Sequence, residues 1–531
     1  MPLFQNESAH TRRIFAEVQP QAQISKYLLF GRVVTMNATR DVLDDGVVGI
    51  IGRDIAFVGD RNQPRPPELG GALEVETGGT IYPGLIELHN HPAYNAIPLW
   101  DAPRGFTNRS QWRSGCPEYV RRVSNPATLI GKNQFDGDYP RAVARFVECK
   151  ALFGGQTTFA GLSASDGKNY VGLVRNVEFP NQPGWPIAHG WINDFTSQAD
   201  ALKSIGAAVG DPAQPQILHL SEGTDQAARD VFFCLKKADD SGWLLAANIL
   251  SIHAVGLKPE DFIILSQAGG LVWSPISNLL LYGETCKVRE AKNAGIAFAL
   301  GADWAPSGSK NLLGELKIAR IVSSYQGDLF NDRELVEMVT CTPAAMMGWQ
   351  TWLGAIAPRL RADLTIISGT SKSPYAQLIE AAETDVVAVL IDGRARYGRA
   401  TLLDPASPSI EKFDVGGSSM LIDLTEVGTD PLGGFALSAA VDKLSYGFAH
   451  LPELAKQRED NSHLLAQRPT TPTLYLEFED TGRHLLAAPP VIHPGDVDRM
   501  AIEPLTAVDD AGFVSRIKAN PNIPDWLRTA I

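Results

Sequence analysis

Two histidines spaced two residues apart stand near the end of the stretch Thr80–Pro92, which reads TIYPGLIELHNHP. The apolar run Leu85–Leu88 before them predicts a β-strand, in which residues two apart point to the same face. The imidazoles of His89 and His91 would therefore aim at one point. Neutral imidazoles are favoured ligands of zinc and iron, so this stretch predicts the start of a metal site.

Three more groups with metal-binding chemistry come directly after short, mostly apolar runs. These groups are His219, His253 and Asp303. In a parallel barrel the C-terminal ends of the strands meet at one face, where the active site is found. Together with the histidine pair, these groups would bring imidazoles and a carboxylate to one place. Three imidazoles and one carboxylate hold Zn²⁺ or Fe²⁺ and leave a position for water.

The chemistry expected of such a site is the activation of water. A bound divalent cation lowers the pKa of its water towards ~7, which gives hydroxide at neutral pH. Asp303 carries charge and can accept the water's proton, while Glu222, shortly after His219, suits general acid–base work. The alternative for Glu222 is a carboxylate stabilised by the dipole of the expected helix Thr224–Lys237. His253 would be a fourth metal-binding imidazole or would polarise the substrate.

The elements that must position these groups are predicted from the alternation of short β-like runs and longer helical stretches between residues 81 and 354. Expected helices include Pro140–Phe153 and Asn311–Ser323. About eight β-then-α units over some 270 residues favour an α/β fold with a distorted (β/α)8 TIM barrel. Residues 27–80 and 355–405 instead read as short strands separated by turns. We expect these two flanks to form one small β-sandwich domain.

The ends of the chain and its composition give further expectations. Residues 1–26 are predicted to be an N-terminal arm, and 406–531 an extension to which we assign no fold. A net charge of −13 argues against nucleic-acid binding or an anionic membrane surface and suits a small-molecule substrate. Five scattered cysteines without a CxxC pair, and no apolar leader, indicate a cytoplasmic protein with reduced thiols. The expected macromolecular partner is the chain itself, in a homo-oligomer.

The segments that carry the candidate residues resemble, in the same order, motifs of the amidohydrolase superfamily. The resemblance covers about residues 27–400 and is strongest to the branch with cytosine, guanine and adenosyl-type deaminases and triazine hydrolases. It implies a barrel with a β-sandwich built from both flanks and one divalent metal, Zn²⁺ with Fe²⁺ as the alternative. Glu222 would then be the proton shuttle, and His253 would face the substrate. The implied metal ligands are His89, His91, His219 and Asp303. The segments are PGLIELHNH, GGQTTF, ILHLSEG, SIHAVGL, VWSPISN and FALGADW.

Two features depart from the deaminase pattern. Trp304 directly follows Asp303, where it would reshape the pocket for an aromatic or larger substrate, or pack between strand and loop. The insertion Ala93–Tyr139 is long for a βα loop, which predicts a lid or substrate wall, with a surface excursion as the alternative. Its arginines Arg104, Arg109 and Arg113 would bind a substrate carboxylate or make internal ion pairs. The residues predicted to bind substrate are Trp273, Ser277, Asn278, Trp304, Trp100 and Arg104.

The predicted function is metal-dependent hydrolysis of a carbon–nitrogen bond, other than a peptide bond, in a small and cyclic or aromatic substrate. The pair of Glu222 and His253 favours deamination of an amidine or heterocycle. The alternative is an amidase acting on amides or ureas, with two metals bridged by Glu178. A more distant alternative is a non-catalytic scaffold with the amidohydrolase fold, although the chain retains every expected ligand.

Overall fold

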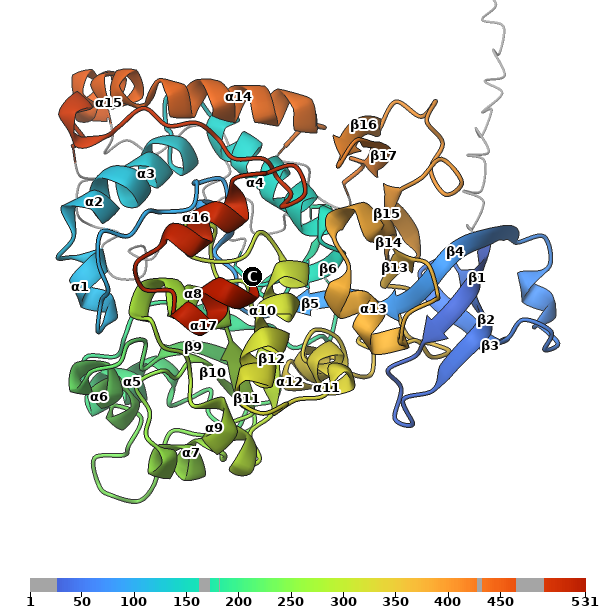
Figure 1. Ribbon diagram of the computed structural model, residues 1–531, viewed down its shortest axis with the longest axis horizontal. Helices are drawn as coiled ribbons and strands as arrows, with labels where there is room; N and C mark the ends of the chain where they lie inside the picture. Colours follow the sequence, from blue (N-terminus) through green and yellow to red (C-terminus); the bar gives the residue numbers. More distant parts are fainter. Residues whose placement is uncertain (1–25, 162–171, 181, 427–431, 465–490) are drawn as a thin grey trace, which may run out of the picture.

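The computed structural model describes residues 26–161, 172–180, 182–426, 432–464 and 491–531. In Figure 1 a body of strands and helices lies on the left and a β-sheet lies on the right. The two parts are joined without a linker, because β4 (Leu73–Pro83) of the sheet runs into β5 (Leu85–Glu87) of the barrel. The arm predicted for residues 1–26 lies, except for its last residue, outside the described residues.

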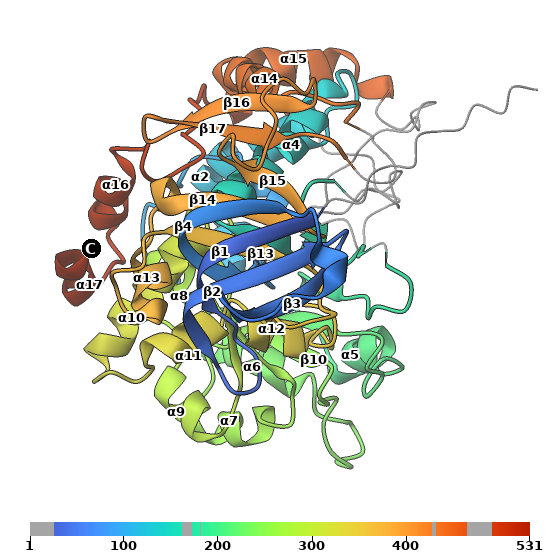
Figure 2. The ribbon, with the colours of Figure 1, turned by 90° about the vertical axis from the view of Figure 1, so that its right-hand side faces the viewer.

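Strands from both flanks of the barrel form a single sheet in the described chain, in the order β16-β17-β15-β14-β13-β4-β1-β2-β3. The flanks meet where β4 pairs with β13 in antiparallel fashion, with Ile81 opposite Ile366. Figure 2 looks onto this sheet, with β3 towards the bottom and β16 towards the top. The other strands are β1 (Lys26–Val34), β2 (Val42–Ile51), β3 (Asp54–Asp60), β13 (Leu364–Ser368), β14 (Val386–Ile391), β15 (Arg394–Gly398), β16 (Ile410–Val415) and β17 (Ser418–Asp423).

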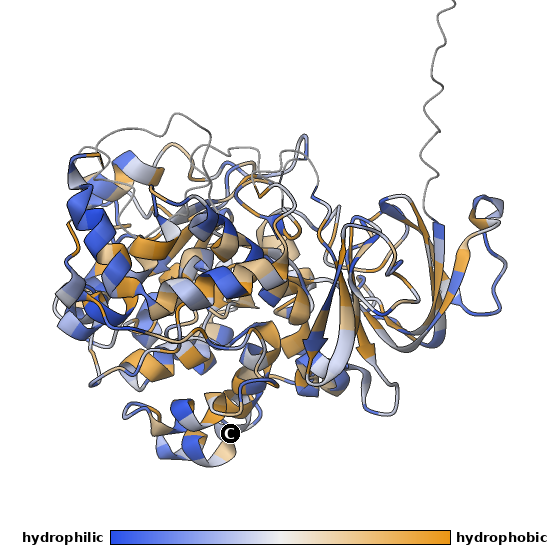
Figure 3. Ribbon diagram, turned by 90° about the horizontal axis from the view of Figure 1, so that it is seen from above, coloured by the Kyte–Doolittle hydropathy of each residue, from blue (hydrophilic) through white to orange (hydrophobic). Residues whose placement is uncertain are grey.

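The sheet folds over on itself, because the β2–β3 turn meets the segment that leads into β13. The backbone N–H of Ala362 donates to the carbonyl of Arg53 at 2.9 Å. Apolar side chains from both flanks, such as Ile50 and Leu390, share a core separate from that of the barrel. Figure 3 shows these strands as largely hydrophobic and their outer loops as more hydrophilic. The two flanks therefore share one sheet and one apolar core.

Eight parallel strands of the described chain form the barrel, in two hydrogen-bonded runs, β5-β6-β7 and β8-β9-β10-β11-β12. Backbone hydrogen bonds of 3.0 Å join the runs at both ends, from Ala188 N–H to Val177 and from Asp303 N–H to His89. Gly301 permits the second junction, since a Cβ there would lie 2.4 Å from the Cβ of His89. These contacts bring the strands into the predicted ring. The remaining strands are β6 (Gln156–Phe159), β7 (Arg175–Asn176), β8 (His189–Trp191), β9 (Gln216–Leu220), β10 (Ile249–His253), β11 (Gly270–Trp273) and β12 (Phe298–Leu300).

Helices surround the barrel strands, as Figure 1 shows. The predicted helices over 140–153 and 311–323 correspond to α4 and α10, whereas the helix expected over 224–237 is shorter. That helix is α6, and its N-cap is Asp225, whose side chain accepts the backbone N–H of Ala228. The helices up to residue 380 are α1 (Arg109–Arg113), α2 (Pro117–Tyr119), α3 (Asn125–Gly131), α4 (Asp138–Phe153), α5 (Gln198–Ile205), α6 (Gln226–Phe233), α7 (Pro259–Leu265), α8 (Pro275–Tyr282), α9 (Val288–Asn293), α10 (Leu312–Tyr325), α11 (Asp332–Glu337), α12 (Cys341–Met346) and α13 (Pro374–Glu380).

The C-terminal extension, for which the sequence predicted no fold, packs on both parts of the molecule. β17 pairs with β15, so the sheet runs past the domain boundary predicted at residue 405. Helix α14 lies along α4, where Gly447 contacts the ring of Tyr139. Nearer the C-terminus, Glu503 and Asp510 pair with the buried Lys310 at 2.7 and 2.9 Å. The helices of the extension are α14 (Leu437–Ala449), α15 (Leu451–Asp460), α16 (Phe513–Ala519) and α17 (Asp525–Ala530).

The structure also describes the state of the cysteines and the character of the helices. Each of the five cysteines, all of them in the described residues, is a free thiol. None of the described helices has both the length and the apolar character needed to span a lipid bilayer.

Candidate metal centre and acid–base site

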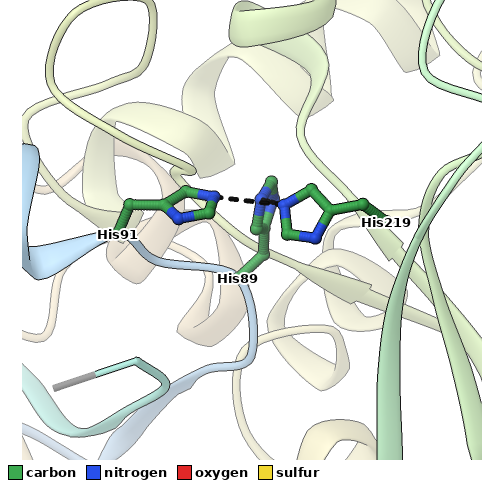
Figure 4. A group of neighbouring side chains, drawn as sticks. All are labelled: His89, His91 and His219. Atoms are coloured by element: carbon green, nitrogen blue, oxygen red, sulfur yellow. Dashed lines mark hydrogen bonds between the residues drawn. The ribbon is translucent and has the colours of Figure 1, made fainter. Parts of the chain in front are cut away.

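Three histidines from two barrel strands converge on one point. The Nε2 atom of His219 lies 3.2 Å from Nε2 of His89 and 3.1 Å from Nε2 of His91. Figure 4 shows the three rings pointing toward one another. His219 lies within β9, whereas the other two follow the end of β5. Sequence positions 130 residues apart are thus brought together by the barrel.

Asp303 completes this cluster, which we name the candidate metal centre (His89, His91, His219 and Asp303). Its Oδ1 atom lies 3.2 Å from Nε2 of His89 and 3.4 Å from Nε2 of His91. Zinc–nitrogen bonds of about 2.0–2.1 Å in a tetrahedral site place ligand atoms ~3.3 Å apart. The four donor–donor distances between these residues therefore match the ligand spacing around one divalent cation.

The Nδ1 atoms of two of the histidines have partners, which leaves their Nε2 atoms to face a cation. Nδ1 of His219 donates to the carbonyl of Trp191 at 3.0 Å, and Nδ1 of His89 lies 2.7 Å from Oγ of Ser274. A metal-binding histidine normally makes such a bond, which fixes its tautomer and ring orientation. The donor set and its surroundings thus fit a resident metal.

Electrostatics at the centre agree with this reading. Burial lowers the pKa of His89, and it lowers the pKa of His219 further, helped by the nearby Arg109. The imidazoles therefore stay neutral, which is the form that binds metals. Burial alone would raise the pKa of Asp303, but the neighbouring His89 and His91 hold it below its usual value. The centre accordingly offers neutral nitrogens and an ionised carboxylate at neutral pH.

The backbone turns sharply where the strands deliver these side chains. His253 and Asp303 both have a φ of 65°, and Ser221 and Ala254 have φ values of 50° and 53°. Non-glycine residues rarely adopt this left-handed conformation, which costs free energy and is concentrated at functional sites. The strained turns lie at the ends of β9, β10 and β12, so they mark the catalytic face of the barrel.

Glu87 joins two of the loops that carry the centre. Its carboxylate accepts the backbone N–H of Ala302 at 2.6 Å and the side-chain amide of Asn90 at 2.7 Å. Burial raises the pKa of Glu87 to about 7. This carboxylate, which sequence reasoning did not single out, fixes the spacing between the His89–His91 loop and the loop that leads to Asp303.

Glu222 and His253 lie together beside the metal centre, and we name them the acid–base site. Oε2 of Glu222 is 3.6 Å from Nε2 of His253. Nδ1 of His253 donates to Oδ1 of Asn278 at 2.9 Å, which directs Nε2 toward Glu222. Burial raises the pKa of Glu222, although His253 and Arg109 oppose the rise. Asp225 is the N-cap of α6, so Glu222 does not cap this helix.

Three of the residues predicted to bind substrate lie next to the candidate site. Ser277 donates to Oδ2 of Asp303 at 2.6 Å. Asn278 holds His253, as described above. The ring centroid of Trp304 lies 6.4 Å from that of His91, and its indole N–H donates to Ser307 at 2.5 Å. Trp304 is buried among aromatic rings of the insertion, so it packs and also borders the centre.

The other three predicted substrate residues lie elsewhere. Trp273 is fully buried and packs against Phe298 and Phe330 in the core, because the strand pleat turns it away while Ser274 faces His89. Trp100 stacks on Phe106. Arg104 is exposed, and its guanidinium lies 5.5 Å from the centroid of the Phe106 ring. The described ring contacts of Trp273, Trp100 and Arg104 are therefore with other aromatic side chains.

Three residues near Glu222 were not among the predicted site residues. Arg109 Nε lies 3.5 Å from Oε2 of Glu222, and the hydroxyl of Tyr282 donates to Oε1 at 2.7 Å. The indole N–H of Trp112 donates in turn to Tyr282 at 2.8 Å. The sequence signalled Arg109 only as one of three arginines in the insertion, and it gave no signal for Tyr282.

Glu178, the bridging carboxylate of the two-metal alternative, lines a small cavity that His89, His91 and His219 also line. Among the described residues, the groups whose ligand atoms lie within 4.8 Å of one another are His89 with His91 and His219, and His89 with His253 and Asp303. Glu178 belongs to neither group, so its carboxylate is not among the donor clusters found in the described residues.

Comparisons with known proteins agree with the motifs. The profile of the amidohydrolase family matches residues 226–396. The chain is also similar to the 5-methylthioadenosine/S-adenosylhomocysteine deaminase of Symbiobacterium thermophilum. The two are 25% identical over 407 residues, which cover 69% of this chain and 92% of that protein.

Solved structures show the same fold. An adenosine deaminase from Xanthomonas campestris with bound zinc matches with a TM-score of 0.56 and 16% identity, covering 72% of this chain and 94% of that one. An atrazine chlorohydrolase from Arthrobacter aurescens TC1, complexed with zinc and atraton, matches with a TM-score of 0.54 and 20% identity over 72% and 97% of the two chains. At these identities the likeness concerns the barrel architecture.

The motif order, the family profile, the relatives and the fold thus agree with one another. They confirm the resemblance predicted from the sequence, and they agree with a site that fits a divalent metal beside a carboxylate. The match over residues 226–396 and the similarity to deaminases support a metal-dependent hydrolase that resembles the mononuclear branch of the amidohydrolase superfamily.

Proposed function

We propose that this protein hydrolyses the exocyclic C–N bond of an amino-substituted nitrogen heterocycle and releases ammonia. The observation that carries the proposal is the placement of Glu222 beside His253, 3.6 Å apart, at the edge of the candidate metal centre. Adding water to a ring amidine requires proton transfer to a ring nitrogen, and a carboxylate at this position suits that transfer. The deaminase names of the relatives support the same reaction.

The proposed roles follow from the atoms each residue presents. A divalent cation on His89, His91, His219 and Asp303 would lower the pKa of a water molecule to about 7. The ionised Glu222 takes one proton from the water and passes it to the ring nitrogen as the water oxygen bonds to the amino-bearing carbon. Asp303 takes the second proton from that oxygen and passes it to the amino nitrogen. The bond from carbon to that nitrogen then breaks, leaving ammonia and a ring carbonyl.

Three finer points belong to this proposal. We infer Zn²⁺ as the metal, because three imidazoles and one carboxylate suit it, with Fe²⁺ as the alternative. We infer a cytoplasmic location from the free thiols. We also infer a homo-oligomer, which sedimentation of the purified protein would test directly.

The substrate class is tested with a panel assayed for ammonia. The panel contains 5′-methylthioadenosine, S-adenosylhomocysteine, adenosine, guanine, cytosine and an aminotriazine, alongside N-acyl amides and ureas. We expect ammonia from at least one amino-heterocycle and its loss in Glu222→Gln with metal content unchanged. Turnover confined to the amides or ureas would replace deamination with the amidase reaction.

A further inference from the structure

A segment of the insertion lies directly against the loop that carries Glu222. Asn108 and Gly223 form a β-bridge, and the backbone N–H of Thr224 donates to the carbonyl of Thr107 at 2.7 Å. Gly223 has a φ of 137°, and a Cβ there would lie 2.4 Å from the carbonyl oxygen of Thr107. Only glycine allows so close an approach, so the insertion and the loop are fitted to each other at the residue after Glu222.

Side chains fasten the same junction. Oδ2 of Asp225 accepts the hydroxyl of Thr107 at 2.8 Å and the side-chain amide of Asn108 at 2.5 Å. The other oxygen of Asp225 accepts the backbone N–H of Ala228 at 2.9 Å and caps α6. The first turn of α6 therefore fixes where the insertion enters α1.

Helix α1, which starts at this junction, reaches both oxygens of the Glu222 carboxylate. Arg109 Nε faces Oε2 at 3.5 Å. Trp112, one helical turn on, donates its indole N–H to the hydroxyl of Tyr282 at 2.8 Å, and Tyr282 donates to Oε1 at 2.7 Å. Because an indole nitrogen can only donate, the tyrosine hydrogen is directed at Glu222.

We propose that residues 107–112 of the insertion, acting with Tyr282, are a positioning element that orients the carboxylate of Glu222 for proton transfer. The insertion is thereby part of the acid–base site and not only a wall of the pocket. Its contacts with Glu222 stand independently of the substrate, whereas the catalytic consequence rests on the proposed function. Arg109, Trp112 and Tyr282 act through Glu222 and need not touch the substrate.

The activity test removes single donors and keeps the aromatic packing. Trp112→Phe and Tyr282→Phe should each lower kcat by ~10–100-fold, as expected for a misplaced catalytic group, with KM changed less than about 3-fold. Arg109→Lys should retain more activity than Arg109→Met. The matched control is Trp349→Phe, which removes an indole hydrogen bond of 3.0 Å to the carbonyl of Pro186 and should leave kcat unchanged.

The pH profile separates positioning from general damage. Glu222 faces His253, Arg109, Tyr282 and the charge of Asp303, and the Tyr282 hydrogen bond stabilises its ionised form. Losing that donor raises the pKa of Glu222. The acidic limb of kcat/KM should therefore move to higher pH in Tyr282→Phe and stay in place in Trp349→Phe. Equal falls at every pH, with no shift of the limb, would overturn the proposal.

A second readout does not need the substrate. Thermal unfolding of the metal-loaded protein is measured for Tyr282→Phe, Glu222→Gln and the double variant. We expect the two changes in Tm to be non-additive, since the residues share a buried hydrogen bond. Additive changes would refute the contact itself. Non-additive changes without turnover on any panel compound would preserve the positioning element and reject the proposed reaction.

Discussion

The candidate metal centre takes all of its donor atoms from the ends of barrel strands, whereas the acid–base site depends on an insertion. His89, His91, His219 and Asp303 are placed by β5, β9 and β12 and the turns that follow them. The Glu222 carboxylate is instead held through Arg109, Trp112 and Tyr282. The difference suggests that metal binding is a property of the barrel itself, while proton transfer is set by a segment that the chain adds to it.

His219→Ala should have the largest effect, because it removes a donor whose Nε2 atom lies 3.2 and 3.1 Å from those of His89 and His91. We expect loss of stoichiometric metal and a fall in kcat/KM of more than about 10³-fold, since water activation depends on the cation. Metal content by elemental analysis and turnover are the measurements. A variant that keeps one metal per chain would break the assignment of the metal centre.

Glu222→Gln should abolish turnover almost as completely while leaving the metal in place. We expect a loss of ~10²–10⁴-fold in kcat, in line with the removal of a general acid–base group. In the native protein, burial raises the pKa of Glu222, so the acidic limb of the profile should lie above the usual range of a glutamate. If metal were lost as well, the two halves of the site would not be separable.

Ser274→Ala should weaken the metal centre and leave the acid–base site unchanged. Ser274 contacts Nδ1 of His89 at 2.7 Å, and the loss of such a partner typically weakens metal binding by ~10–100-fold. We expect weaker metal retention in competition with a chelator and an unshifted pH profile once metal is in excess. Tyr282→Phe should give the opposite result, with metal affinity unchanged and the profile moved.

Glu315→Gln should change how the stability of the folded protein depends on pH. Glu315 accepts the backbone N–H of Ile276 in the first turn of α8 at 3.1 Å, and burial raises its pKa from 4.5 to about 8. Between these pH values the folded protein binds more protons than the unfolded chain, so stability falls as pH rises. The variant removes this contribution, of order a few kcal/mol. Its Tm should therefore fall less than that of the native protein between pH 5 and 8, at full metal loading.

The metal centre could be predicted from the sequence because its residues obey a local rule. Each follows an apolar run, and parallel strands bring their C-terminal ends to one face. Trp273, the last residue of β11, was predicted to line the pocket from the family segment that it belongs to, and the structure packs its ring against Phe298 and Phe330. The pleat there turns Ser274 toward His89. A pattern of apolar residues does not show which of two neighbouring residues at a strand end faces the site.

Other features depend on tertiary contacts that no local pattern carries. The bond from Trp112 to Tyr282 links residues 170 positions apart, and both belong to short helices. Arg104 and Arg109 look alike in the sequence, yet one is exposed and the other is buried beside Glu222. In the extension, β16 and β17 lie among turn-forming residues, and their strand character becomes clear only when β15 supplies a partner.

The order of strands in the sheet has a consequence for synthesis on the ribosome. β4 ends at Pro83, but its antiparallel neighbour β13 begins only at Leu364, after the whole barrel has been translated. At ~5–20 residues per second the nascent chain carries an open β4 edge for tens of seconds. Chaperones that cover unpaired strand edges should therefore govern the yield of this protein more strongly during translation than after release.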